Sequence, residues 1–253
     1  GASGNPTAEI IIAIFALLFS LNFGLYFLLL QRRFKEALKS DEARFFLLLV
    51  AGSTALITIN IMPIYENVWD SLRYAFFQVA SIISTTGFAT ADFVLWPHFS
   101  QMILVILMFC GACAGSTGGG IKCSRVVMLL RSIRRELHRI AHPRSVEVVR
   151  LDGKPVDEST LHSVLVFIGF YILIILTAAL VVSLDNVPFD VSFSAALTCV
   201  SNVGPGLATI GPSGNFAAFS PLSKVVLSLC MIIGRLEIFP MLVFFMPDTW
   251  RRF

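Results

Sequence analysis

Two short glycine-containing strips in the sequence could bind a dehydrated cation through the peptide backbone. The strips are Thr85-Thr86-Gly87 and Asn202-Val203-Gly204. Each follows a short helix-forming segment, whose carboxyl end would carry partial negative charge. Glycine permits the positive φ that a row of exposed carbonyls needs, and carbonyl rings replace the hydration shell of an ion in cation filters. The alternative is two ordinary loops, each with a turn glycine.

A glycine-rich segment elsewhere in the chain is flexible enough to act as the gate of an ion pathway. Residues 111–120 contain five glycines, and glycine in a helix interior costs about 1 kcal/mol relative to alanine. We therefore expect a helix to break here and a new one to begin near Lys122. A flexible loop beneath an ion filter would act as its gate, and the alternative is a purely structural kink. The loop residues assigned to the gate are Gly111, Gly115, Ser116, Thr117, Gly118, Gly119 and Gly120.

Two ionisable residues, Arg235 and Glu237, interrupt the last apolar stretch. Such groups are costly to bury in a membrane unless they are paired or hydrated. Side chains at positions i and i+2 of a helix point about 200° apart, so these two do not face one another. We assign both to the gate, with Arg235 as an electrostatic barrier or latch and Glu237 as an anchor for a neighbouring segment. The alternative is a structural ion pair with another helix.

The elements that position these residues belong to a very apolar chain. Of its 253 residues, 56% are hydrophobic and 14% are charged, and its mean hydropathy is +0.82. A soluble domain has about 25% charged residues, so this chain has too little polar surface to be soluble. The composition also excludes disordered and disulfide-rich secreted proteins. It predicts an integral membrane protein.

Apolar stretches and basic blocks together predict the topology. A helix needs about 20 apolar residues to cross a bilayer, and Lys and Arg collect on the cytoplasmic side. Lys and Arg are concentrated in residues 32–44, 122–154 and 251–252, which places these segments inside the cell. The predicted membrane-spanning stretches are residues 9–30, 45–65, 99–121, 161–184 and 222–247.

Two further apolar segments, 70–88 and 190–206, are too short to cross and fall on the predicted outer side. Segments of this length are candidates for re-entrant loops. They align as an internal repeat, because residues 84–88 match residues 201–205 in glycine placement. The sequence therefore predicts an all-α integral membrane protein built from tandem helix–re-entrant pore loop–helix (M1-P-M2) repeats, as in potassium channels.

The repeats divide the chain into three expected units. Residues 1–43 hold the closing transmembrane helix of a preceding repeat and a cytoplasmic linker, residues 44–158 a pore repeat with an interrupted second helix, and residues 159–253 another pore repeat. Residues 122–142 are expected to form a basic cytoplasmic helix, and residues 145–156 a small hairpin around a turn. This hairpin could dock a cytosolic subunit or be a solvated connector.

Other chemistries fit the residues poorly. The five cysteines lie in or beside apolar segments, which favours reduced thiols over a disulfide framework or a metal site. An intramembrane enzyme would need Ser116 or Cys113 as its nucleophile. Its candidate base would be His98, His138 or His142, and each of these three lies outside the predicted spans. We therefore expect no enzyme activity. The basic blocks are explained by topology, so we expect no nucleic-acid partner.

Taken together, these features resemble the Trk/Ktr/HKT superfamily of cation transporters. The resemblance is carried by residues 84–88, residues 202–206, the glycine segment 111–122 and the Gly-Arg-Leu-Glu-Ile-Phe motif at 234–239. It implies four helix–loop–helix repeats around one pore, of which this chain resembles the C-terminal half. It also implies that the glycine segment and Arg235 gate the pore.

The resemblance further implies a pore subunit for potassium uptake in the bacterial inner membrane, with no organic cofactor in this chain. The expected partners are a second copy of the membrane subunit in a homodimer, a cytosolic nucleotide-binding ring of the TrkA/KtrA type, and the lipid bilayer. The implied filter residues are Thr85, Thr86, Gly87, Asn202, Val203 and Gly204. Potassium is expected to bind the backbone carbonyls of Thr86, Gly87, Val203 and Gly204.

Two filter strips cannot encircle an ion. We therefore expect either that this chain is a fragment that lacks N-terminal pore repeats, which is the simpler case, or that two copies assemble around one pore. Two functional alternatives stay open. One is a sodium-permeable or poorly selective transporter of the same superfamily, and the other is a non-conducting structural half.

Overall fold

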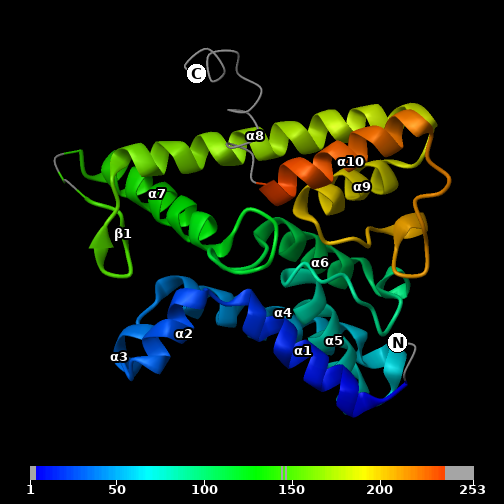
Figure 1. Cartoon of the computed structure of the whole chain (residues 1–253), viewed down its shortest axis with the longest axis horizontal. Helices are drawn as coiled ribbons and strands as arrows, with labels where there is room; N and C mark the ends of the chain where they lie inside the picture. The colour runs from blue at the N-terminus through cyan, green and yellow to red at the C-terminus, as the bar shows by residue number, and fades with distance from the viewer. Residues whose placement is uncertain (1–3, 144, 146, 237–253) are drawn as a thin grey trace.

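The computed structural model describes residues 4–143, 145 and 147–236 (Figure 1). This part of the chain is mostly helical, which confirms the predicted all-α membrane class. The helices are α1 Pro6–Ser20, α2 Phe23–Leu30, α3 Phe34–Ala37, α4 Asp41–Tyr65, α5 Val68–Ile83, α6 His98–Cys110, α7 Cys123–Ala141, α8 Glu158–Val182, α9 Phe189–Ser201 and α10 Pro221–Leu236. The strands are β1 Arg150–Leu151 and β2 Lys154–Pro155, and short 3-10 turns lie at Phe93–Leu95, Ser183–Asp185 and Ala208–Ile210.

A long helix, a short buried helix and a third helix occur in the same order twice. Helices α4, α5 and α6 form one group, and α8, α9 and α10 form the other (Figure 1). In the short helices, residues 77–83 of α5 and residues 194–201 of α9 are all buried. A helix that is buried all round lies inside a protein rather than on its surface. The carboxyl ends of both short helices therefore lie in the interior of the protein.

Two of the predicted spans are confirmed by length and composition. Among the described residues, Asp41–Tyr65 and Glu158–Asp185 are long and apolar enough to cross a membrane. Residues 9–30, predicted to form one transmembrane helix, are instead divided between α1 and α2, which meet at a 90° bend. Counted as one span, this bent pair would be a third.

The bend between α1 and α2 coincides with a contact to the glycine-rich loop. Asn22 lies at the bend, and its side chain caps the start of α2. The Cys113 N–H donates to the Ser20 carbonyl at 3.0 Å, and the Phe23 N–H donates to the Gly115 carbonyl at 3.2 Å. Backbone groups that the bend frees are therefore paired with the loop, which a prediction based on hydropathy alone did not include.

The break between α6 and α7 was predicted from the glycines and is confirmed. Helix α6 ends before Gly111, whose φ is 65°, and α7 begins at Cys123. Residues 99–121 therefore do not form one continuous spanning helix. The stretch predicted at residues 222–247 begins as α10 and continues outside the described residues.

The predicted basic helix and hairpin are also confirmed. Helix α7 is followed by β1 and β2, which pair antiparallel. Asp152 and Gly153 make the turn, and both have positive φ. Asp41 of α4 ties these elements together, because one of its carboxylate oxygens accepts from Arg131 of α7 and from the Asp152 N–H, each at 2.8 Å.

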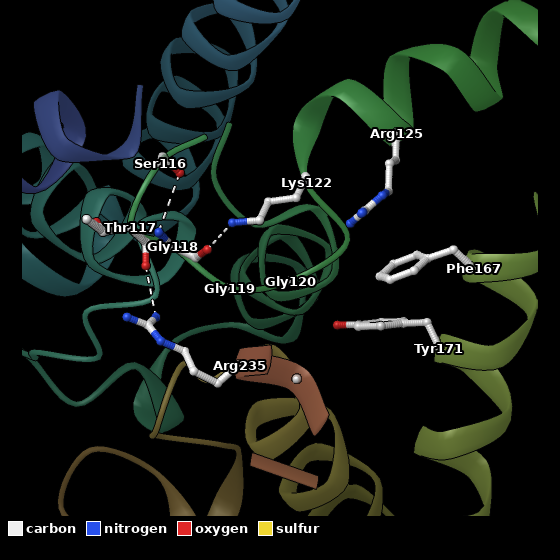
Figure 2. Close-up of a pocket in the computed structure, with 11 residues that line it drawn as sticks. Ser116, Thr117, Gly118, Gly119, Gly120, Lys122, Arg125, Phe167, Tyr171 and Arg235 are labelled. Atoms are coloured by element: carbon white, nitrogen blue, oxygen red, sulfur yellow. Dashed lines mark hydrogen bonds between the residues drawn. The ribbon is translucent and has the colours of Figure 1, made fainter. Parts of the chain in front are cut away.

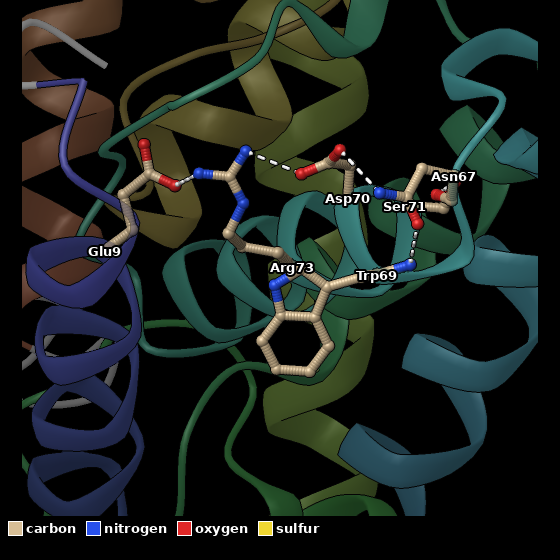
Figure 3. A network of polar contacts seen from close by, with 6 residues as sticks. All are labelled: Glu9, Asn67, Trp69, Asp70, Ser71 and Arg73. Atoms are coloured by element: carbon tan, nitrogen blue, oxygen red, sulfur yellow. Dashed lines mark hydrogen bonds and ion pairs between the residues drawn. The ribbon is translucent and has the colours of Figure 1, made fainter.

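A buried ion pair joins α1 to α5 (Figure 3). Arg73 of α5 donates to Glu9 of α1 at 2.9 Å and to Asp70 at 3.1 Å. The Arg73 and Glu9 side chains are only 10% and 7% exposed. A buried charge is costly without its partner, so this pair fixes the position of α5 against α1.

Helices α9 and α10 approach closely at Gly234, where a Cβ atom would lie 1.9 Å from the Val200 carbonyl oxygen. We predict that Gly234→Ala lowers the free energy of unfolding by about 1–3 kcal/mol, the usual cost of overpacking. Thermal unfolding in detergent measures this. The matched control is Gly169→Ala in α8, where a Cβ would meet nothing within 4 Å. Equal melting temperatures for the two variants would contradict the prediction.

Candidate ion filter and gating loop

The two predicted strips lie against one another at the carboxyl ends of α5 and α9. A Cβ atom on Gly87 would lie 2.1 Å from the Val203 carbonyl oxygen, so the two backbones are in contact. The expected positive φ is present in both strips. It is +57° at Thr85, +76° at Gly87, +57° at Asn202 and +109° at Gly204.

Hydroxyl groups hold the two strips in equivalent ways. In the first strip, the Ser81 hydroxyl donates to the Phe88 carbonyl at 2.5 Å. In the second, the Thr198 hydroxyl donates to the Pro205 carbonyl at 3.0 Å. The pairs correspond in the register that aligns residues 84–88 with 201–205. Ser81 and Thr198 were not assigned from the sequence, although each stands at the same distance before its glycine.

Backbone bonds repeat in the same register. The Thr86 N–H donates to the Ser81 carbonyl, and the Val203 N–H donates to the Thr198 carbonyl, both at 3.0 Å. Each strip therefore leaves its helix through the same kind of turn. This equivalence supports the internal repeat that glycine placement suggested.

The glycine-rich loop passes directly beside both strips. The Gly119 N–H donates to the Thr85 hydroxyl at 2.9 Å. A Cβ on Gly119 would lie 2.2 Å from the Ser201 carbonyl oxygen, and one on Gly118 would lie 3.2 Å from the Ser84 carbonyl oxygen. Only residues without side chains fit here. The loop therefore contacts the ends of α5 and α9 at the same time.

Two cationic side chains bind successive carbonyls of the loop (Figure 2). Arg235 of α10 donates to the Thr117 carbonyl at 2.9 Å. Lys122, at the start of α7, donates its Nζ proton to the Gly118 carbonyl. The sequence assigned Arg235 to the gate but did not assign Lys122, whose only signal is its position directly after the glycine run.

A cavity of about 270 Å³ lies on one side of the loop. Its described charged lining residues are all cationic, namely Lys122, Arg125 and Arg235. Arg125 lies over the Phe167 ring, with 3.9 Å between the guanidinium carbon and the ring centroid. The cavity therefore places three cationic side chains beside the loop (Figure 2).

The structure brings most of the predicted site residues together, but not all in one place. Gly111 packs against the Gly119 carbonyl, where a Cβ would lie 2.3 Å away. Gly115 instead contacts the bend after α1, and the Ser116 hydroxyl donates to the Cys113 carbonyl at 2.5 Å. Glu237 lies outside the described residues.

Three cysteines, Cys110, Cys113 and Cys123, lie in or directly beside the glycine-rich loop. All five cysteines are buried free thiols. Among the described residues, no group of three or more His, Cys, Asp or Glu side chains could hold a metal ion. The other groups that meet at the loop are backbone carbonyls, hydroxyls, cationic side chains and the Glu42 carboxylate.

The fold and the site define a multi-pass membrane protein in which two buried half-length helices meet at a glycine-rich loop. A family model described as TrkH, cation transport protein, matches residues 4–251, and the chain belongs to this family. The chain is a multi-pass protein of the bacterial inner membrane.

Relatives support the family assignment over almost the whole chain. The Trk system potassium uptake protein TrkH of Salmonella typhimurium is 36% identical over 99% of this chain and 52% of its own length. Its namesake in Escherichia coli K12 is 35% identical with the same coverage. The crystal structure of the potassium transporter TrkH from Vibrio parahaemolyticus matches with a TM-score of 0.88 at 30% identity, over 98% of this chain and 53% of that chain. The chain spans about half the length of these relatives.

We predict that Thr85→Val lowers the free energy of unfolding by about 1–3 kcal/mol, because the Gly119 N–H loses its acceptor. Thr85→Ser keeps the hydroxyl and should stay close to the parent protein. The denaturation midpoints of the two variants in detergent measure the difference. A midpoint for Thr85→Val that equals that of Thr85→Ser would show that this hydrogen bond does not stabilise the loop.

Proposed function

We propose that this chain forms half of a pore for potassium uptake. Potassium binds the backbone carbonyls of the two filter strips, and the loop at residues 111–122 closes the path beyond them. The observation that carries the proposal is the loop's contact with both strips while Arg235 and Lys122 bind its carbonyls. The relatives' names as potassium uptake proteins support the choice of ion.

The proposed filter residues and their roles follow the expected pattern. The carbonyls of Thr86, Gly87, Val203 and Gly204 replace the hydration shell of potassium. Thr85 and Asn202 support the strips from the side, because Thr85 binds the loop and the Asn202 amide donates to the Met231 carbonyl of α10 at 3.1 Å.

The gate works by charge and by occlusion in this proposal. In the closed state the loop fills the space beside the strips, and Arg235 adds a positive barrier. Opening breaks the hydrogen bonds from Arg235 to Thr117 and from Lys122 to Gly118. Loop residues Gly111, Gly115, Ser116, Gly119 and Gly120 supply the flexibility for this movement.

The proposed pore requires three kinds of partner in addition to this chain. N-terminal pore repeats supply the remaining filter strips, and a second copy of the membrane subunit forms a homodimer. A cytosolic nucleotide-binding ring docks on the inner face, where the basic helix α7 and the hairpin provide a surface. This chain carries no organic cofactor and no enzyme activity in the proposal, and any nucleotide site belongs to the ring.

Rubidium uptake into proteoliposomes, with potassium and sodium as competitors, tests the proposed filter. We predict that Gly87→Ser and Gly204→Ser reduce the preference for potassium over sodium about tenfold, since a Cβ at positive φ costs about 1–2 kcal/mol. Gly169→Ser, in open space on α8, is the control. Equal competition by sodium in the parent protein would favour a sodium-permeable transporter. No uptake with the N-terminal repeats present would favour a non-conducting half.

We predict that Arg235→Ala raises rubidium flux about tenfold or more, because a hydrogen bond from a charged group contributes about 1.5–3 kcal/mol to the closed loop. Arg235→Lys keeps the charge but loses the planar donor geometry, and it should give an intermediate flux. Arg139→Ala, an exposed arginine near the end of α7, is the control. An unchanged flux in Arg235→Ala would remove this residue from the gate.

A further inference from the structure

Glu42 of α4 is a buried carboxylate that contacts both ends of the glycine-rich loop. The residue is only 6% exposed. Its Oε1 atom accepts the Ala114 N–H at 2.7 Å and the Ser124 N–H at 2.9 Å. Ala114 lies near the beginning of the loop, and Ser124 lies in the first turn of α7, directly after it. A single oxygen atom therefore joins the two ends of the loop.

The start of α7 needs such a partner. The first N–H groups of a helix have no acceptor within the helix, and Lys122 at the N-cap position makes no side-chain cap bond. The partial positive charge of a helix N-terminus favours an anion. Glu42 provides this anion from a different helix, and the two N–H donors offset the cost of burying its charge.

Glu42 binds the loop at different positions from the cationic side chains of Arg235 and Lys122. Arg235 and Lys122 bind carbonyls in its middle, at Thr117 and Gly118. Glu42 binds N–H groups at its two ends. Backbone hydrogen bonds also close the base of the loop, where the Lys122 N–H donates to the Cys110 carbonyl at 3.1 Å and the Cys123 N–H donates to the Ala112 carbonyl at 3.0 Å. Glu42 adds a charged acceptor to this base, so its loss would weaken the base without releasing it completely.

The neighbouring carboxylate has a separate partner set, which makes it an internal comparison. Asp41 precedes Glu42 on α4 and accepts from Arg131 and from the Asp152 N–H. It therefore joins α4 to α7 and to the hairpin, and its hydrogen-bond partners within the described part of the chain lie outside the loop. Adjacent acidic residues on one helix thus bind two different structures.

We propose that Glu42 is a positioning residue that holds residues 115–120 in place by fixing both ends of the loop. The consequence for ion flow rests on the proposed function, whereas the effect on the loop does not. Hydrogen–deuterium exchange in detergent, on the transporter that contains this chain, measures the loop directly. Rubidium flux measures the consequence separately.

Glu42→Ala should raise amide exchange in residues 111–124 about tenfold or more, because two N–H groups lose a charged acceptor. Exchange in α8 and α9 should not change. Glu42→Gln keeps an oxygen that can accept the same bonds, so its effect should be smaller. Asp41→Ala is the matched control and should leave exchange in residues 111–124 at the parent level.

Three results would overturn the proposal: unchanged exchange in residues 111–124, an equal increase in α8 and α9, or an equal increase in Asp41→Ala. Faster exchange confined to the loop supports it. If that local increase comes with unchanged rubidium flux in a conducting parent protein, Glu42 still positions the loop. That result would contradict the role of the loop as a gate. Failure of the Glu42 proposal can therefore be told apart from failure of the proposed function.

Discussion

Backbone polar groups in a non-helical segment at membrane depth must find partners within the protein. The loop between α6 and α7 is the segment where this requirement is most demanding, because its glycines prevent a continuous helix. Its N–H groups bind the Thr85 hydroxyl and the Glu42 carboxylate, and its carbonyls bind Arg235 and Lys122. Helices α4, α5, α7 and α10 therefore converge on one short stretch of chain. The bend between α1 and α2 contributes a fifth set of partners through its own backbone.

The chemical character of these partners has a consequence for ion movement. A carbonyl that already accepts from a guanidinium or ammonium group is not free to bind a passing cation. In the proposed closed state the loop is both a physical obstruction and a row of occupied acceptors, beside a cavity whose described charged residues are all cationic. The proposed opening would exchange bonds that each contribute about 1.5–3 kcal/mol for other contacts. That amount is within the coupling energy that a bound partner can supply.

The two halves of the site are equivalent in their backbone and different in their side chains. Ser81 and Thr198 perform the same task in the two strips. By contrast, Thr85 binds the loop, whereas Asn202 binds the Met231 carbonyl one turn before Arg235. Thr85 is thus hydrogen-bonded to the loop, whereas Asn202 is hydrogen-bonded to α10. The two copies of the repeat share the same backbone turn. The side chains that differ between the copies, Thr85 and Asn202, bind different neighbouring elements.

Features that depend on neighbours in the sequence were determined by the sequence itself. The composition determined the membrane class, the five glycines of residues 111–120 determined the break after α6, and the turn residues determined the hairpin. The positive φ at Gly87 and Gly204 also followed from the residue type, whereas the positive φ of the β-branched Thr85 did not. In each case the physical cause, namely solvation or backbone strain, acts over a few residues and leaves a local pattern.

Partners that lie far apart in the chain were decided only by the tertiary structure. The apolar run over residues 9–30 predicted a single span, whereas the structure has a bend there whose backbone groups are hydrogen-bonded to a loop far along the chain. Glu42 lies in a basic segment that predicted a cytoplasmic linker, yet it is buried against that same loop. Arg235 had a predicted role but no predicted acceptor. A hydrogen bond requires a donor and an acceptor to lie close together in space. The sequence of one segment does not identify which distant residue will supply its hydrogen-bond partner.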